Sequence, residues 1–178
     1  MKHRLLIYMT ALALLLALTG PAGAEPPKGS QENPLLASLR EMGTLRFEGV
    51  NPETDEPAAA RLTLSIESVL TEERALERIN QLAFANFTGD SYFCYRVYLS
   101  AEAFEGSDAL SVTAADFKVL DAGGAETPIL TKYEEVELME GFPTWLSIGV
   151  STPGTSPARL VFADTLWFDL TGAPAPVE

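Results

Sequence analysis

Histidine is nearly absent from this sequence, and cysteine occurs once. The only histidine is His3, so the rest of the chain cannot build a Ser-His-Asp triad, a Cys-His pair or a zinc site based on histidine. The single cysteine, Cys94, cannot form an internal disulfide, and the fold must therefore depend on its apolar core. Cys94 lies within an apolar, alternating segment. This position favours a packed, inert thiol over an intermolecular bridge.

Basic residues are also scarce. The chain has 12 Lys and Arg against 25 Asp and Glu, and residues 1–24 contain two of the basic residues and none of the acidic ones. Residues 25–178 therefore hold 10 basic and 25 acidic residues, a formal charge of −15. This charge repels phosphate groups, which argues against nucleic acid or anionic lipid as a partner. We interpret the acidity as a source of solubility. Calcium binding is the alternative, but no D-x-D-x-D-G loop is present.

The first 24 residues are typical of a secretory signal. A basic start is followed by an apolar run and a small-residue cleavage site, namely Lys2 and Arg4, Leu5–Leu18 and Ala22-Gly23-Ala24. A membrane anchor is the alternative, but the uncharged run is shorter than the ~20 residues that a spanning helix needs. We therefore expect a signal peptide at 1–24. The remainder would be released to the periplasm, the cell surface or the medium, without membrane insertion after cleavage.

Residues 25–44 are predicted to form a flexible start and a short helix. Asn33 can cap this helix, Pro34 suits its first position and Gly43 suits its end. Its apolar residues, Leu35, Leu36, Leu39 and Met42, would share one face that must be buried. At the other end, residues 171–178 are rich in Gly, Pro and Ala, and we expect a flexible tail.

Residues 45–170 are predicted to form one β-sandwich domain. Leu62, Leu64 and Ile66 alternate with polar residues in a half-buried strand at 61–70. Further strands are predicted at 81–87, 91–101, 110–113, 117–121, 126–130, 145–151, 158–162 and 165–170, with turns at 88–90 and 153–156. Thr71-Glu72-Glu73 is typical of a helix start, which predicts a helical insert at 72–80. The acidic residues 133–140 are interpreted as a solvated loop or sheet edge. Short strands separated by turn residues indicate a mainly β, antiparallel sandwich.

Four segments together resemble a known family. They are Tyr95–Leu99, Ala109–Val112, Asp116–Gly124, and Pro153–Ser156 leading into Leu160–Phe162. Their order resembles the telokin-like, immunoglobulin-like sandwich domain of secreted bacterial proteins, a group that includes immunoprotective extracellular antigens and domains of unknown function. The resemblance covers residues 92–170 and departs from the family at Ser100-Ala101-Glu102 and at the insert of residues 71–81. It implies an immunoglobulin-like sandwich, brings no catalytic residues, and implies a binding role by analogy.

Alternation also predicts which aromatic side chains lie off the core face. In 145–150 the core residues are Leu146, Ile148 and Val150, so that Trp145 points outward. Applied to three strands, the same rule predicts a candidate ligand-binding surface of Trp145, Trp167, Tyr98, Tyr92, Arg96 and Asp169. Such aromatics can stack on sugar rings or fill a partner's pockets. We favour the alternative interpretation, in which the predicted N-terminal helix covers this face. The surface also requires that the three strands share one sheet.

We expect a non-catalytic binding or interaction domain whose partner is a protein at the cell exterior. A carbohydrate-binding module that uses the outward Trp and Tyr residues is the alternative. No catalytic residue, metal site or cofactor is predicted. An enzyme could act only through carboxylate pairs, as in glycoside hydrolysis, and the pairs considered are Glu102 with Glu105 and Asp164 with Asp169. We interpret these pairs, and the glycosylation sequon Asn86-Phe87-Thr88, as chance in a chain of this composition.

Overall fold

The computed structural model describes residues 25–89, 91–152 and 156–176. Several predictions lie wholly or partly outside these residues. They are the signal peptide at 1–24, the last residue of the turn at 88–90, residues 153–155 of the predicted bend, and the last two residues of the predicted tail.

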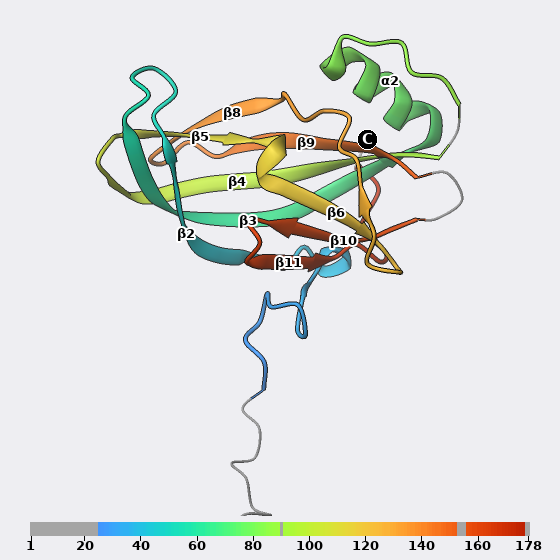
Figure 1. The fold of residues 1–178 in the computed structure, drawn as a ribbon. Coiled ribbons are helices and arrows are strands. Elements are labelled where there is room, and N and C mark those ends of the chain that lie inside the picture. Colours follow the sequence, from blue (N-terminus) through green and yellow to red (C-terminus); the bar gives the residue numbers. More distant parts are fainter. Residues whose placement is uncertain (1–24, 90, 153–155, 177–178) are drawn as a thin grey trace, which may run out of the picture.

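Two sheets enclose most of the apolar core (Figure 1). The four-stranded sheet has the antiparallel order β2 (Gly43–Val50), β3 (Pro57–Thr71), β4 (Tyr92–Glu105) and β9 (Thr144–Ser151). The five-stranded sheet has the order β1 (Leu35–Leu36), β11 (Leu166–Asp169), β10 (Pro157–Phe162), β6 (Phe117–Asp121) and β7 (Glu126–Thr127). Only β1 and β11 pair in parallel in this sheet. The predicted mainly β fold with antiparallel sheets is confirmed.

The acidic segment predicted as a loop or edge contains a strand. β8 (Glu135–Met139) pairs with β5 (Ala109–Thr113) as a separate two-stranded sheet. Ser111 of β5 donates a hydrogen bond to the Glu135 carboxylate across this pair. Of the strand predicted at 126–130, only Glu126–Thr127 is regular.

The core follows from alternation along the strands. Leu62, Leu64 and Ile66 of β3 are fully buried, because successive side chains of a strand point to opposite faces. Phe162 joins the two sheets, with its ring centroid 5.0 Å from that of Phe47 and 4.7 Å from that of Phe117. Each buried side chain of this size stabilises the fold by roughly 1.5–3 kcal/mol relative to an exposed one. The core therefore supports the fold without any disulfide.

The predicted helical insert is confirmed and is longer than expected. Helix α2 (Glu72–Ala83) begins with two acidic residues, which suit the positive end of the helix dipole, and ends at Phe84 in a left-handed conformation with φ of 49°. The strand predicted at 81–87 is wrong. Residues 81–83 complete the helix, and the Asn80 side chain then accepts from the Phe87 N–H at 2.7 Å and donates to the Phe87 carbonyl at 3.1 Å. This side chain takes the hydrogen bonds that a strand partner would provide.

The helix predicted from Pro34 does not form. Leu35–Leu36 instead pairs with β11, and a 3-10 turn, η1 (Ala37–Leu39), follows it. The Glu41 carboxylate accepts from the Leu36 N–H at 2.6 Å. Leu35 is buried, whereas Leu39 and Met42 are 67% and 63% exposed, so these residues do not share one face. Backbone groups that would form hydrogen bonds within a helix are instead bonded to the edge of the sheet and to the Glu41 side chain. Gly43, predicted to end the helix, begins β2.

Candidate aromatic–arginine site

An aromatic pair and an arginine lie together on the outer face of the four-stranded sheet. Tyr98 of β4 and Trp145 of β9 are directly opposite in register, and their ring centroids are 6.1 Å apart in an edge-to-face arrangement. The Arg96 guanidinium carbon lies 4.7 Å from the centroid of the Trp145 ring, within the range of a cation–π contact. Trp145 is 40% exposed. We call Arg96, Tyr98 and Trp145 the open aromatic cluster.

Strand alternation and a bulge together orient this cluster. Val97 and Leu146 point inward and are fully buried, so their neighbours along the strands point outward. The β3–β4 register shifts between Ile66 and Ser68, which places Ser68 opposite Arg96. Glu67 lies within this shift, and its carboxylate is 3.4 Å from Nε of Arg96. The bulge thus supplies the acid that fixes Arg96 beneath Trp145.

A pocket of about 420 Å³ lies between the open aromatic cluster and α2. Arg74 and Arg78 of α2 line it, one helical turn apart, together with Arg96 of β4. The remaining lining residues are Ser68, Leu70, Cys94, Trp145, Ser147 and Pro176. Among the described residues that line the pocket, every charged side chain is thus an arginine. The volume of the pocket is within the range of small-ligand sites. We call it the arginine pocket.

The C-terminal segment helps to enclose this pocket. The Val69 N–H donates to the carbonyl of Pro174 at 2.8 Å, and Ala173 packs against the core. These contacts place the first part of the predicted flexible tail against β3. Pro176 reaches the wall of the arginine pocket from there.

One further acid lies beside the arginine pocket. Glu134 accepts a hydrogen bond from the Ser147 N–H at 3.1 Å, and its Oε2 atom is buried without a hydrogen-bond partner among the described residues. Burial raises the pKa of the Glu134 carboxyl, and the hydrogen bond from Ser147 and the charge of Arg78 oppose this rise. Glu134 and Glu67 are therefore counter-charges for Arg78 and Arg96 at the rim of the pocket.

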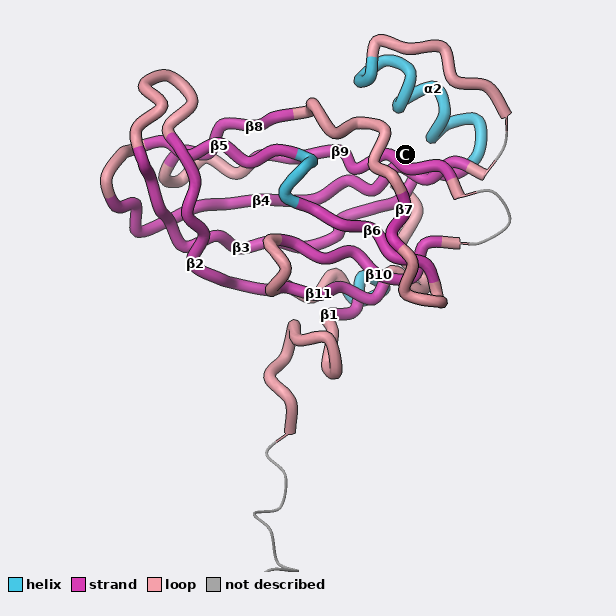
Figure 2. The backbone as a smooth tube through the Cα atoms, in the orientation of Figure 1, coloured by secondary structure: helices cyan, strands magenta, loops and turns pink. Residues whose placement is uncertain are grey.

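Tyr92, predicted to face outward with the cluster, is buried under α2 beside Cys94. These two residues are 6% and 3% exposed and pack with Ala75 and Ile79 of the helix. Figure 2 shows the helix over this end of the sheet. The Tyr92 hydroxyl donates to the Thr88 carbonyl at 2.9 Å. Burial raises the pKa of the Cys94 thiol to about 12, the Glu134 charge adds to the rise, and Arg78 opposes it. Cys94 is the packed, protonated thiol that the sequence predicts.

Trp167 and Asp169 lie in β11, which belongs to the five-stranded sheet. The backbone N–H of Trp167 donates to the carbonyl of Gly29 at 2.8 Å. Asp169 pairs with Arg159 at 2.7 Å and accepts from the Thr171 N–H at 2.9 Å. Burial raises the pKa of Asp169, but these bonds outweigh it and the net shift is downward. The structure thus unites Trp145, Tyr98 and Arg96 and separates them from Trp167 and Asp169.

The covering element is also different from the predicted one. The segment around β1 extends the five-stranded sheet, and α2 covers part of the outer face of the four-stranded sheet. Arg74 and Arg78 were not among the predicted site residues. Their four-residue spacing in a predicted helix is a signal that they share a face, but sequence alone does not show that this face meets Arg96.

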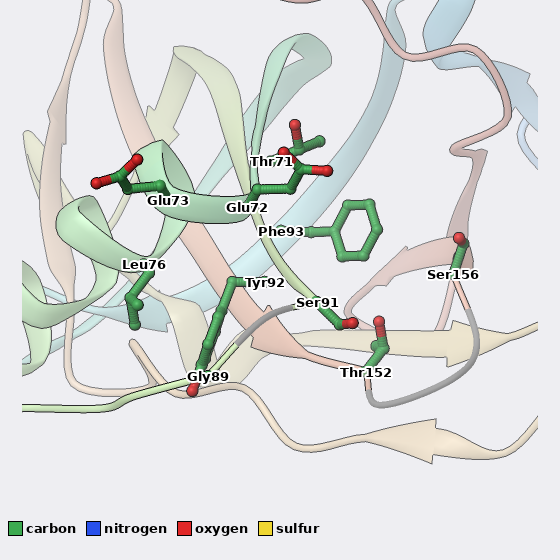
Figure 3. A pocket seen from close by; sticks show the side chains of 10 residues that line it. All are labelled: Thr71, Glu72, Glu73, Leu76, Gly89, Ser91, Tyr92, Phe93, Thr152 and Ser156. Atoms are coloured by element: carbon green, nitrogen blue, oxygen red, sulfur yellow. The ribbon is translucent and has the colours of Figure 1, made fainter.

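A second hollow, of about 830 Å³, lies where α2 begins (Figure 3). Glu72 and Glu73 line it from the helix, Phe93 lines it from the start of β4, and Ser91 lines it from the position just before that strand. The Thr152 hydroxyl oxygen, also in this lining, is buried without a hydrogen-bond partner among the described residues. Carboxylates, hydroxyls and an aromatic ring together suit a polyhydroxylated ligand.

The carboxylates considered for hydrolysis have separate partners. Glu102 pairs with Arg61 at 3.3 Å, and Glu105 pairs with Arg46 at 2.9 Å. Asp164 pairs with Lys118, and Asp169 pairs with Arg159. Over residues 25–89, 91–152 and 156–176, no group of three or more His, Cys, Asp or Glu side chains is arranged to hold a metal ion. No helix in the same ranges combines the length and the apolar character needed to cross a membrane.

Comparison with known protein families, curated proteins and solved structures yields no match to this chain.

Proposed function

We propose that this chain is an exported, non-catalytic binding domain that contacts a partner protein outside the cytoplasm through the open aromatic cluster. The observation that supports this most is the position of Arg96 against Trp145 on an accessible sheet face, with the 420 Å³ arginine pocket beside them. Trp, Tyr and Arg are the residues in which binding energy concentrates at protein interfaces. An accessible set of all three therefore favours a docking surface.

The cluster is built on strands, which favours binding without reordering. β4 and β9 pair along eight register positions, from Tyr92 opposite Ser151 to Leu99 opposite Thr144. The backbone of paired strands loses little conformational freedom when a partner docks, because it is already fixed. The separate ion pairs of Glu102, Glu105, Asp164 and Asp169 support a non-catalytic role.

The immunoglobulin-like assignment and the export are parts of the same proposal. Two packed sheets with antiparallel neighbours support a sandwich of the telokin-like, immunoglobulin-like type. The basic start, apolar run and small-residue site within residues 1–24 support export. A sandwich of this kind commonly serves as a scaffold for recognition, which agrees with the proposed role.

Affinity capture with matched variants tests the function. The protein without residues 1–24 is immobilised as wild type, as Trp145→Ala and as Phe84→Ala, and is exposed to a cell-surface extract. Phe84 is 97% exposed at the end of α2 and lies outside the lining of the arginine pocket, so it controls for loss of any exposed aromatic. We expect a partner that the wild type and Phe84→Ala retain and that Trp145→Ala loses by about tenfold or more. Equal retention by all three proteins contradicts the proposal.

A carbohydrate-binding role is the second candidate, and the hollow at the start of α2 favours it. The buried Thr152 hydroxyl without a partner and the carboxylates of Glu72 and Glu73 could bind ligand hydroxyls there. A glycan array separates the two candidates. Binding that Glu72→Gln abolishes and Trp145→Ala leaves intact would favour this second function.

A further inference from the structure

We infer that the arginine pocket accepts a compact carboxylate group, such as an acidic side chain that the partner protein presents. This inference rests on the proposed function and specifies the chemistry of the partner. Arg74, Arg78 and Arg96 provide the charge, and Trp145 and Leu70 are an apolar part of the wall. A carboxylate on a short apolar stem, as in glutamate, matches both features.

The backbone that carries the two helical arginines is fixed in place. Ala75 and Ile79, each next to one of these arginines in sequence, are fully buried against β4 and β9. This packing holds the helix over the sheet and orients Arg74 and Arg78 toward the side where Arg96 lies. Guanidinium groups bind carboxylates in a planar, bidentate geometry. Arginines that converge from a helix and a strand can therefore bind one carboxylate from two directions.

The charge of the lining distinguishes this pocket from its neighbours. Another hollow on the same sheet is lined by Arg46 and Arg61, but Glu105 lines it as well. A third contains Arg46 together with Glu48 and Glu105. In those two hollows an acid is part of the described lining, whereas Glu67 and Glu134, which face Arg96 and Arg78, lie outside the described lining of the arginine pocket. Three of the ten basic residues in 25–178 thus line one pocket.

The total charge restricts the size of the ligand. Residues 25–178 carry a formal charge of −15, which repels an extended polyanion. At physiological ionic strength, screening limits the interaction of exposed charges to about 8 Å, so the charges beside the pocket matter more to a ligand inside it than the total charge of the protein. A single carboxylate can therefore enter where a long acidic surface would be repelled.

Titration with glutarate tests the inference, and glutaramide is its uncharged control. The Trp167→Phe protein leaves Trp145 as its only tryptophan, so that its fluorescence reports on the wall of the pocket. We expect a saturable change at roughly millimolar glutarate, and none with glutaramide or with sodium chloride of equal ionic strength. The same change with glutaramide or salt, or no saturation, would overturn the inference.

Charge variants locate the binding. In the Trp167→Phe protein, Arg74→Gln and Arg78→Gln should each weaken glutarate binding by about fivefold or more, because each removes one charged donor. Arg61→Gln is the matched control, since Arg61 lies on the same sheet outside this pocket and pairs with Glu102. Equal weakening by Arg61→Gln would indicate a general charge effect and contradict the assignment.

Two further results separate the inference from the proposed function and from a rival source of the carboxylate. If Trp145→Ala abolishes partner capture but glutarate does not bind, the pocket inference fails and the proposed function stands. If glutarate binds but Trp145→Ala captures the partner as well as the wild type does, the proposed function fails and the assignment of carboxylate binding to the pocket stands.

The end of the chain is a rival source of the carboxylate, because Glu178 follows Pro176 by two positions in the sequence. The test uses a variant that ends at Pro176 in a C-terminal amide, so that the truncation adds no carboxylate at the wall of the pocket. Glutarate binding that is several-fold tighter would overturn the assignment to a partner protein, and unchanged affinity supports it.

Discussion

The outer face of the four-stranded sheet has two halves that differ in what lies on them. Under α2, the strands β4 and β9 present Tyr92, Cys94 and Gly149, and Ala75 and Ile79 of the helix fill the space above. Beyond the helix, the same two strands present Arg96, Tyr98 and Trp145. Both halves have identical pairing and alternation. The difference lies in side-chain size and polarity, and in the single element that covers one half.

Gly149 shows how the covered half is made. A Cβ atom at this position would lie 2.5 Å from Cγ1 of Ile79 and 2.9 Å from Cγ2 of Thr131, closer than packed atoms can approach. The Thr131 hydroxyl accepts from the Gly149 N–H at 2.9 Å and donates to the carbonyl of Ser147 at 2.8 Å. The covered half is therefore a closely packed core in which the Thr131 hydroxyl satisfies the backbone of Ser147 and Gly149. Among the described residues, no helix covers the open half in this way, and Trp145 is 40% exposed there.

Replacing Ile79 with alanine should have the largest effect on the covered half. Ile79 is fully buried between α2 and the sheet, and truncation of such a side chain costs about 2–4 kcal/mol in the free energy of unfolding. Urea unfolding followed by circular dichroism measures this loss. Phe84→Ala, at the exposed end of the same helix, is the control and should change the free energy by less than about 0.5 kcal/mol. Equal effects of the two changes would show that α2 is not docked as described.

Replacing Gly149 with alanine should have the next largest effect, about 1–3 kcal/mol of destabilisation from overpacking. The cause can be isolated by a double-mutant cycle, because Ile79→Ala removes the Cγ1 atom that the new methyl would meet. We expect Gly149→Ala to cost less in the Ile79→Ala protein than in the wild type. Strict additivity of the two changes would refute close contact between Gly149 and Ile79.

The comparison of the two halves also shows how far alternation can predict a site. It correctly placed Leu146, Ile148 and Val150 inward and Trp145 outward. It did not predict that Tyr92 is buried, because a side chain that leaves the core face of a sheet can still be covered by a helix. Alternation specifies a face of a strand, and the packing of other elements decides whether that face meets solvent.

Strand pairing is a second property that alternation does not determine. Trp167 was expected beside Trp145, but β11 pairs with β10 and β1 in the opposite sheet. Which strands become neighbours depends on contacts between distant parts of the chain. The N-terminal helix failed for a similar reason. The local signals at Asn33, Pro34 and Gly43 were outweighed by pairing of Leu35 with Phe168 at a sheet edge. The helical insert was predicted correctly because its start signal, Thr71-Glu72-Glu73, is local.

Replacing Trp145 with alanine should have the smallest effect on stability and yet abolish partner capture. Trp145 is 40% exposed, and an exposed cation–π contact contributes only about 0.5–1 kcal/mol. We therefore expect the free energy of unfolding, measured in urea by circular dichroism, to fall by less than about 1 kcal/mol. A loss near that of Ile79→Ala would mean that Trp145 is a packing residue and that the open half is structural. A small loss of stability with a large loss of binding would instead assign packing to the covered half and recognition to the open half. A side chain that contributes little to folding but is needed for capture must act on the partner.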